Sequence, residues 1–134
     1  MSKIDIYIDW VPGNYSARPV SEEVACVATG KTLEEAQRNI VEALKFHVDG
    51  LREMGERVPQ PLQGKFQPVF HLSTRAQLKY ADCFITRKAL ARETGIAEQQ
   101  LSHYANGQRH PRPDMQRRIT AGLQAICSRL SLIL

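Results

Sequence analysis

The residue types best suited to chemistry gather around two predicted short helices in the second half of the chain. The second of these helices opens with four polar side chains, Glu98, Gln99, Gln100 and His103, and the first opens with Arg87. Gln can pair with adenine and Arg with guanine through two atoms, and Glu can accept a hydrogen bond from cytosine. These five side chains are therefore our candidates for reading base edges in duplex DNA.

A second group of polar and basic residues surrounds this run and suits phosphate oxygens. Phosphate contacts position a protein on DNA without reading its sequence. The group consists of Thr86, Lys88, Asn106, Gln108, Arg109 and Arg112.

A glycine turn between two helices would position both groups. We expect helices over residues 85–94 and 97–106, with Gly95 reversing the chain between them because glycine tolerates positive φ. Leu90, Ile96 and Leu101 have the spacing of a shared core. This layout is typical of a helix-turn-helix, which inserts its second helix into the major groove. An ordinary helical hairpin with a polar exterior stays open as the alternative.

Charge divides the chain into two unlike halves. Residues 1–65 hold 8 Lys and Arg against 10 Asp and Glu, whereas residues 66–134 hold 10 against 4. The net charge is thus −2 in the first half and +6 in the second. Such an asymmetry indicates a basic half that meets a polyanion, although a solvated basic face with no partner has the same composition.

The first half reads as a small sheet followed by one helix. Ile4, Ile6, Ile8 and Trp10 alternate with polar residues, which is the period of a half-buried strand. We expect strands over residues 3–11, 15–20 and 24–29. Thr32 and Glu35 have the spacing of a capping box, so a long helix should begin there and end near residue 55.

Prolines and glycines over residues 58–64 indicate a boundary. We expect a first domain over residues 1–62, a linker or further strand over residues 63–72, and a helical second domain over residues 73–134. The second domain should add helices over residues 73–83 and 114–130 and a short terminal strand over residues 131–134. A sheet covered by a helix, followed by an all-helical domain, predicts an α+β fold class.

Two stretches resemble known families. The run from Ile85 to Ala91, with Gly95 and then Leu101 to Gly107, resembles the phage-repressor or Cro class of helix-turn-helix over about residues 84–123. The resemblance implies that Arg87 and the opening residues of the recognition helix touch bases.

The first half resembles the HicB antitoxin domain, a partial RNase H-like fold. The resemblance rests on strand 4–11, the turn Gly13-Asn14-Tyr15, the run Gly30-Lys31-Thr32-Leu33-Glu34-Glu35-Ala36, and the helix end over residues 55–59. Glu23-Val24 replaces the Pro-Gly that the family usually has before its third strand. With both modules in this order, the chain resembles full-length HicB antitoxins from end to end.

This resemblance implies a type II antitoxin with two roles. Its first half would bind a HicA-type, mRNA-cleaving ribonuclease toxin, and its second half would repress its own operon on double-stranded operator DNA. Carboxylates available to meet the cationic toxin are Asp5, Asp9, Glu22, Glu23, Glu34 and Glu35. Plain solvated carboxylates are the alternative for each of them. A helix-turn-helix regulator whose first half senses a small ligand is the alternative for the whole chain.

Helix-turn-helix repressors usually bind as two-fold dimers, because a single module buries little surface. The end of this chain has surplus apolar residues, namely Leu130, Leu132, Ile133 and Leu134. We therefore expect a homodimer or higher oligomer held by the last helix and residues 131–134, the latter as an intermolecular strand.

Composition and missing patterns exclude other classes. No apolar run approaches the ~20 residues of a membrane span, so we expect a cytoplasmic protein without membrane contact.

The three cysteines and four histidines do not have the spacing of metal ligands, so we expect no metal and no cofactor. Asp5 and Asp9 lie about 13 Å apart along a strand, too far to share one ion, and no nucleophilic triad appears. We therefore do not expect an enzyme.

Overall fold

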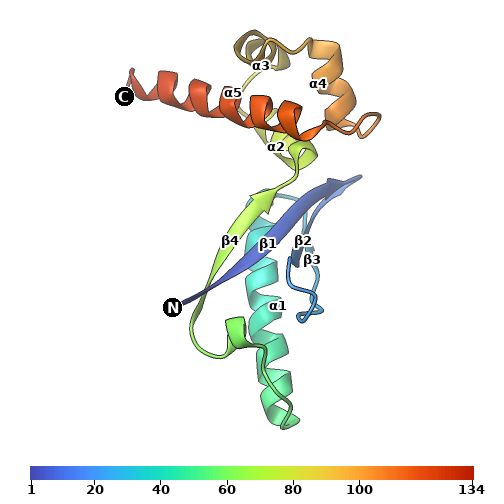
Figure 1. The fold of residues 1–134 in the computed structure, drawn as a ribbon, viewed down its shortest axis with the longest axis vertical. Coiled ribbons are helices and arrows are strands. Elements are labelled where there is room, and N and C mark those ends of the chain that lie inside the picture. The colour runs from blue at the N-terminus through green and yellow to red at the C-terminus, as the bar shows by residue number, and fades with distance from the viewer. The chain divides into compact units, whose positions relative to one another are not determined.

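The computed structural model describes residues 1–134 and divides them into two compact units, residues 1–73 and residues 74–134 (Figure 1). The first unit is a mixed sheet with one long helix, and the second contains helices only. The predicted α+β class is confirmed. No helix is long and apolar enough to span a membrane.

Four strands form the sheet of the first unit. They are β1 (Ser2–Val11), β2 (Asn14–Pro19), β3 (Ala28–Gly30) and β4 (Phe66–Leu72). Their spatial order is β3-β2-β1-β4. The three chain-consecutive strands pair antiparallel, and β4 pairs parallel to β1. The strand alternative for residues 66–72 is therefore the correct one, and this segment belongs to the first unit.

The helix α1 (Leu33–Glu53) covers one face of this sheet (Figure 1). Ile4, Ile6 and Ile8 point to the covered face and are buried, as the period-2 pattern predicts. α1 lays its own buried stripe against them, consisting of Leu33, Ala36, Ile40, Leu44 and Val48. A 3₁₀ turn, η1 (Gln60–Leu62), then adds the buried side chain of Leu62 before the chain enters β4.

The start of α1 explains the run from Gly30 to Ala36. Thr32 caps the helix, because its Oγ1 accepts a hydrogen bond from the backbone N of Glu35 at 3.1 Å. A Cβ on Gly30 would lie 2.9 Å from both the Cα of Ala36 and the backbone carbon of Glu35. Glycine at this position therefore allows β3 and the first turn of α1 to pack backbone against backbone.

The predicted strand over residues 24–29 is wrong for its first four residues. Only Ala28 and Thr29, continued by Gly30, pair with β2. The backbone N of Val24 instead donates to the carbonyl of Ser21 in a turn, at 3.3 Å, and the Val24 side chain is buried. Val27 is 65% exposed. The apolar run thus supplies one core side chain from a loop, which a propensity pattern cannot distinguish from a strand.

Four helices build the second unit: α2 (Thr74–Ala81), α3 (Arg87–Thr94), α4 (Glu98–Ala105) and α5 (Pro113–Ser131). Their core consists of Leu78, Leu90, Ile96, Leu101, Tyr104 and Ile119. α5 packs against α3 at a close approach, where a Cβ on Gly122 would overlap the Cγ2 atom of Thr94.

The predicted terminal strand over residues 131–134 is wrong. α5 continues to Ser131, and the backbone N of Leu132 donates to the carbonyl of Arg129 at 3.1 Å. Ile133 and Leu134 make the same type of i−3 bond, at 3.2 and 3.4 Å. The backbone groups of the tail are thus used within a helix end, which removes the basis for an intermolecular strand.

Candidate nucleic-acid interface

A helix-turn-helix forms from α3, α4 and the three residues between them. Thr86 caps α3 by accepting a hydrogen bond from the backbone N of Ala89 at 3.0 Å. Gly95 ends α3 with φ of 72°, the left-handed conformation that reverses the chain. Ile96 and Leu101 anchor the turn and α4 in the core. The glycine and the core positions agree with the sequence prediction.

The face of α4 opposite its core carries a polar stripe. Leu101 and Tyr104 are the buried positions of this helix. Residues 99, 102, 103 and 106 have the i, i+3, i+4, i+7 spacing of a single helix face, so they lie together on the other side. We call Gln99, Ser102, His103 and Asn106 the α4 stripe. Gln99 and Asn106 are exposed, and Ser102 and His103 are half-buried.

Two further predicted base readers lie beside the stripe. Glu98 is exposed in the first turn of α4. Gln100 is half-buried, and its Nε2 donates to the hydroxyl of Tyr104 at 2.8 Å. This hydrogen bond directs the Gln100 amide along the helix toward the core residue Tyr104.

Arg87, the remaining predicted base reader, is tied to two other residues. Its Nε and Nη2 donate to the two carboxylate oxygens of Asp82 at 3.2 and 2.6 Å. Its Nη1 donates to the hydroxyl of Ser102 at 3.1 Å. The first residue of α3 is therefore linked both to the turn before it and to the α4 stripe.

The predicted phosphate-binding residues fall into two places. Thr86 and Lys88 lie at the start of α3, and both are exposed. The others follow α4: the backbone N of Gln108 donates to Asn106 Oδ1 at 3.0 Å, and Asn106 Nδ2 donates to Gln108 Oε1 at 3.1 Å. Arg109 and Arg112 are exposed in the same loop before α5.

Two arginines outside the predicted set hold the ends of the motif helices. Arg75 donates through Nε to the carbonyl of Ala105 at 3.1 Å and through Nη2 to that of Asn106 at 3.2 Å. Arg118 donates to the carbonyl of Thr94 at 2.8 Å. Cations at helix C-termini satisfy carbonyls that lack a partner within the helix. Both residues thereby fix the segments that carry the candidate DNA contacts.

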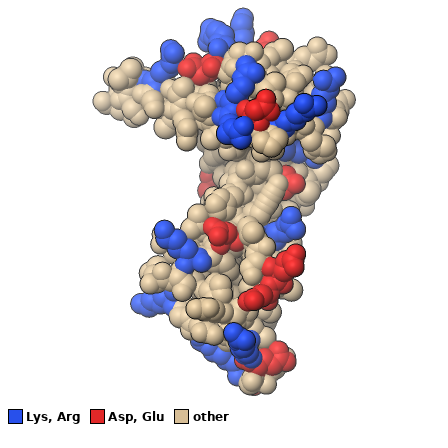
Figure 2. All heavy atoms as spheres, in the orientation of Figure 1, with Lys and Arg blue, Asp and Glu red and all other residues tan.

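Basic side chains dominate the surface of the second unit. Residues 74–134 hold ten Lys and Arg against four Asp and Glu. On the face of this unit that Figure 2 shows, basic groups lie at several places with few acidic groups between them. Charge of this sign and density attracts duplex DNA and makes the affinity depend on salt.

Residues 85–124 match the helix-turn-helix family model. The matched segment covers the motif helices α3 and α4 and the first part of α5, so it includes every candidate base reader. No significantly similar relative was found among curated proteins. The match, the motif geometry and the charge together support a DNA-binding transcription regulator.

The six carboxylates predicted to meet a cationic partner lie on different elements of the first unit. Asp5 and Asp9 are on the sheet face that α1 leaves open. His71 Nε2 lies 2.8 Å from Asp5 Oδ1, and Asp9 Oδ1 accepts from Ser73 Oγ at 2.6 Å. The other four lie in the loop before β3, with Glu22 and Glu23, and in the first turn of α1, with Glu34 and Glu35. The six carboxylates therefore come from three different segments of the first unit.

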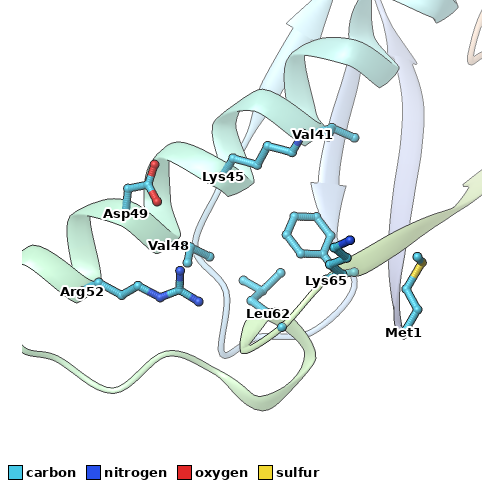
Figure 3. Close-up of a pocket in the computed structure, with 10 residues that line it drawn as sticks. Met1, Val41, Lys45, Val48, Asp49, Arg52, Leu62 and Lys65 are labelled. Carbon is cyan, nitrogen blue, oxygen red and sulfur yellow. The ribbon is translucent and has the colours of Figure 1, made fainter.

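A hollow of about 500 Å³ lies between α1 and the chain that enters β4 (Figure 3). Val41, Val48, Leu62 and Phe66 supply its apolar lining. Lys45, Arg52 and Lys65 also line it, and Asp49 is its single acidic residue. No local sequence pattern indicates this hollow, because its residues come from segments that only the fold brings together.

No three His, Cys, Asp or Glu side chains gather where they could bind a metal ion. All three cysteines are free thiols. Burial raises the pKa of the Cys26 thiol above its usual value, so this thiol stays protonated and is a poor ligand near neutral pH.

The two residues that hold Arg87 are not among the predicted DNA contacts. Ser102 follows Gln99 by three positions, so helical spacing alone places it on the same face as that predicted base reader. Asp82 is different, because it lies before a turn and its distance from Arg87 depends on how that turn folds. No local pattern indicated the pair.

Proposed function

We propose that this protein is the antitoxin of a type II toxin–antitoxin system. Its second unit binds operator DNA as a dimer and represses its own operon, and its first unit binds and neutralises a HicA-type ribonuclease. The observation that carries the proposal is the joining, in one chain, of a basic helix-turn-helix unit with a separate sheet-and-helix unit of opposite net charge.

DNA binding rests on the α4 stripe and its surroundings. Gln99 and His103 face the base edges when α4 enters the major groove, and Glu98 reaches them from its first turn. Thr86, Lys88, Arg109 and Arg112 contact phosphates on either side. Each well-formed base contact contributes about 1–3 kcal/mol of discrimination, whereas each phosphate contact strengthens binding to all sequences.

Dimerisation rests on the end of α5, with a second copy of this chain as the occupant of its apolar tail. The residues Leu130, Leu132, Ile133 and Leu134 are 52%, 84%, 79% and 102% exposed. A cluster of four exposed large aliphatic residues is a surface that a soluble chain normally covers. Because residues 131–134 continue a helix end, we now expect contact between helices instead of strand pairing.

The oligomeric state tests this contact directly. Replacing Leu130 and Ile133 with Glu puts charge into the apolar contact, so light scattering should show a monomer at concentrations where the unchanged protein is a dimer. Phe46→Glu is the matched control, because Phe46 is 81% exposed on α1 of the other unit. A double variant that stays dimeric, or a control that also dissociates, would place the interface elsewhere.

Toxin binding belongs to the first unit, and we assign it to the open face of the sheet. That face carries Asp5 and Asp9 as well as Tyr7, whose ring lies 5.4 Å from the guanidinium carbon of Arg18. Aromatic and arginine side chains are enriched at protein interfaces, and acidic groups beside them favour a cationic partner. The order of three antiparallel strands, a helix and a parallel fourth strand also fits a partial RNase H-like fold.

Co-expression tests the toxin role. The ribonuclease would be a small basic protein encoded beside this gene, and both should co-purify as a complex that leaves a reporter mRNA intact. Asp5→Lys together with Asp9→Lys should release the ribonuclease, whereas Glu53→Lys at the far end of α1 should not. If the intact protein fails to bind either neighbouring gene product, the antitoxin proposal is wrong while DNA binding stands.

The hollow beside α1 supports a second candidate, a regulator whose first unit senses a small ligand. Three cationic side chains around an apolar lining suit a small organic anion. A panel of aromatic and acyl carboxylates should then raise the melting temperature of the wild type but not of Lys65→Glu. An unchanged melting temperature with every compound rejects this candidate and leaves the antitoxin proposal.

A further inference from the structure

A carboxylate holds the first residue of the helix-turn-helix in place. Asp82 accepts two hydrogen bonds from Arg87, at 3.2 and 2.6 Å, and the side chains are 40% and 22% exposed. Ser102 accepts a third, at 3.1 Å, from the α4 stripe. The guanidinium group is thus fixed by two partners on different elements.

We propose that Asp82 is a positioning residue for DNA recognition, which sets sequence specificity by fixing the Arg87 guanidinium. The inference deepens the proposed DNA-binding function and rests on it. In this proposal Asp82 does not itself contact a base. It acts through Arg87, and Ser102 connects the fixed guanidinium to the helix that enters the groove.

Hydrogen-bond geometry supports this role. A guanidinium has five N–H donors, and Asp82 and Ser102 occupy three of them, which leaves two for DNA. A free arginine at this position could reach phosphates and several bases by changing rotamer. A fixed one offers its remaining donors in one direction only, and preorganised contacts of this kind discriminate between bases more sharply.

Electrostatics supports it independently. Asp82 is one of only four acidic residues in a unit with ten basic ones, and it lies directly beside the candidate DNA contacts. A carboxylate there repels phosphates and weakens binding to every sequence. Asp82 thus lowers the affinity of the protein for DNA of any sequence. Because it also fixes the contact residue Arg87, we expect it to contribute to discrimination between sequences.

The test compares Asp82→Asn with Asp114→Asn, which removes the same charge from an exposed site in the first turn of α5. The probes are a duplex selected from a random library by the wild-type protein and a scrambled duplex of the same composition. Fluorescence anisotropy at fixed salt gives the ratio of the two dissociation constants. We expect both variants to bind the scrambled duplex more tightly, but only Asp82→Asn to lower the discrimination ratio, by about tenfold.

Two further variants separate positioning from folding. Arg87→Lys keeps the positive charge but not the fork that a carboxylate holds, so it should lose discrimination to a similar degree. In an Arg87→Ala background, Asp82→Asn should leave the ratio unchanged, because its effect passes through Arg87. Asp82→Glu keeps the carboxylate and should recover part of the wild-type ratio.

The possible outcomes are distinct. If Asp82→Asn keeps the wild-type ratio, or changes it equally in the Arg87→Ala background, Asp82 has no positioning role and the inference is overturned while the DNA-binding function stands. If selection with the wild-type protein yields no preferred duplex, the proposed function itself fails and the inference fails with it.

Discussion

Replacing Gly30 with Ala should destabilise the first unit, although the change adds a single methyl group. The new Cβ would lie 2.9 Å from the Cα of Ala36 and from the backbone carbon of Glu35, and closer still to the backbone N of Ala36. These obstacles are backbone atoms of a capped helix turn, so no side chain can rotate away. Overpacking lowers the free energy of unfolding by about 1–3 kcal/mol, and a rigid obstacle favours the upper end of this range.

One opposing term reduces this cost. Alanine lowers the conformational entropy of the unfolded chain and thereby stabilises the folded state by about 0.4–1 kcal/mol. We therefore expect the free energy of unfolding to fall by about 2 kcal/mol. With a urea m value of roughly 1–2 kcal/mol/M for a unit of this size, the midpoint should fall by about 1 M or more.

Tryptophan fluorescence during urea unfolding measures this effect on the intact chain. Trp10 is the single tryptophan, and it packs against Tyr15 with ring centroids 4.8 Å apart, so its signal follows the first unit alone. Gly50→Ala is the control, because its Cβ would meet nothing within 4 Å and alanine favours the helix interior by about 1 kcal/mol. If Gly30→Ala raises the midpoint as Gly50→Ala should, the close approach of β3 and α1 is wrong.

Three further predictions concern the remaining elements. Gly122→Ala should destabilise the second unit by about 1 kcal/mol in a thermal melt. In a Thr94→Ser background, which lacks only the obstructing methyl group, Gly122→Ala should be neutral or stabilising. Equal effects of Gly122→Ala in both backgrounds would contradict this packing. Arg109→Ala should weaken binding to all duplexes alike and lower the salt slope by about one, whereas a loss restricted to one sequence would make it a base reader. A fragment of residues 1–73 should unfold cooperatively in urea. A fragment of residues 1–62 lacks β4 and should not unfold cooperatively. Cooperative unfolding of the shorter fragment would show that the first unit folds without β4.

Local patterns predicted much of the fold. The alternation of Ile4, Ile6 and Ile8 predicted β1, and the capping pair Thr32 and Glu35 predicted the start of α1. The glycine at position 95 predicted the turn of the helix-turn-helix. In each case the signal lies within a few residues, where backbone geometry and hydrogen bonding are decided.

Long-range features were beyond such patterns. The pairing of β4 with β1 joins residues more than sixty positions apart, so the sequence left residues 66–72 open between linker and strand. The apolar side chains of residues 131–134 predict a strand, but the backbone groups of this tail bond within the end of α5.

The same limit applies to the candidate site. Residue type and position at the start of a helix predicted Gln99 and His103 as base readers, and the structure places both on one face of α4. The same reasoning assigned Arg87 to base reading without Asp82, the partner that fixes its guanidinium across a turn. Residue type suggested which bases a side chain can pair with, whereas its hydrogen-bond partners decide where it is held.

Binding of the intact protein to the DNA upstream of its own gene tests the central claim most directly. At about 0.15 M salt, we predict that this DNA binds at least a thousandfold more tightly than an unrelated duplex of the same length, and that Gln99→Ala removes about 1–3 kcal/mol of the difference. Equal affinity for the two duplexes, with no effect of the substitution, would contradict the assignment of α4 as a recognition helix.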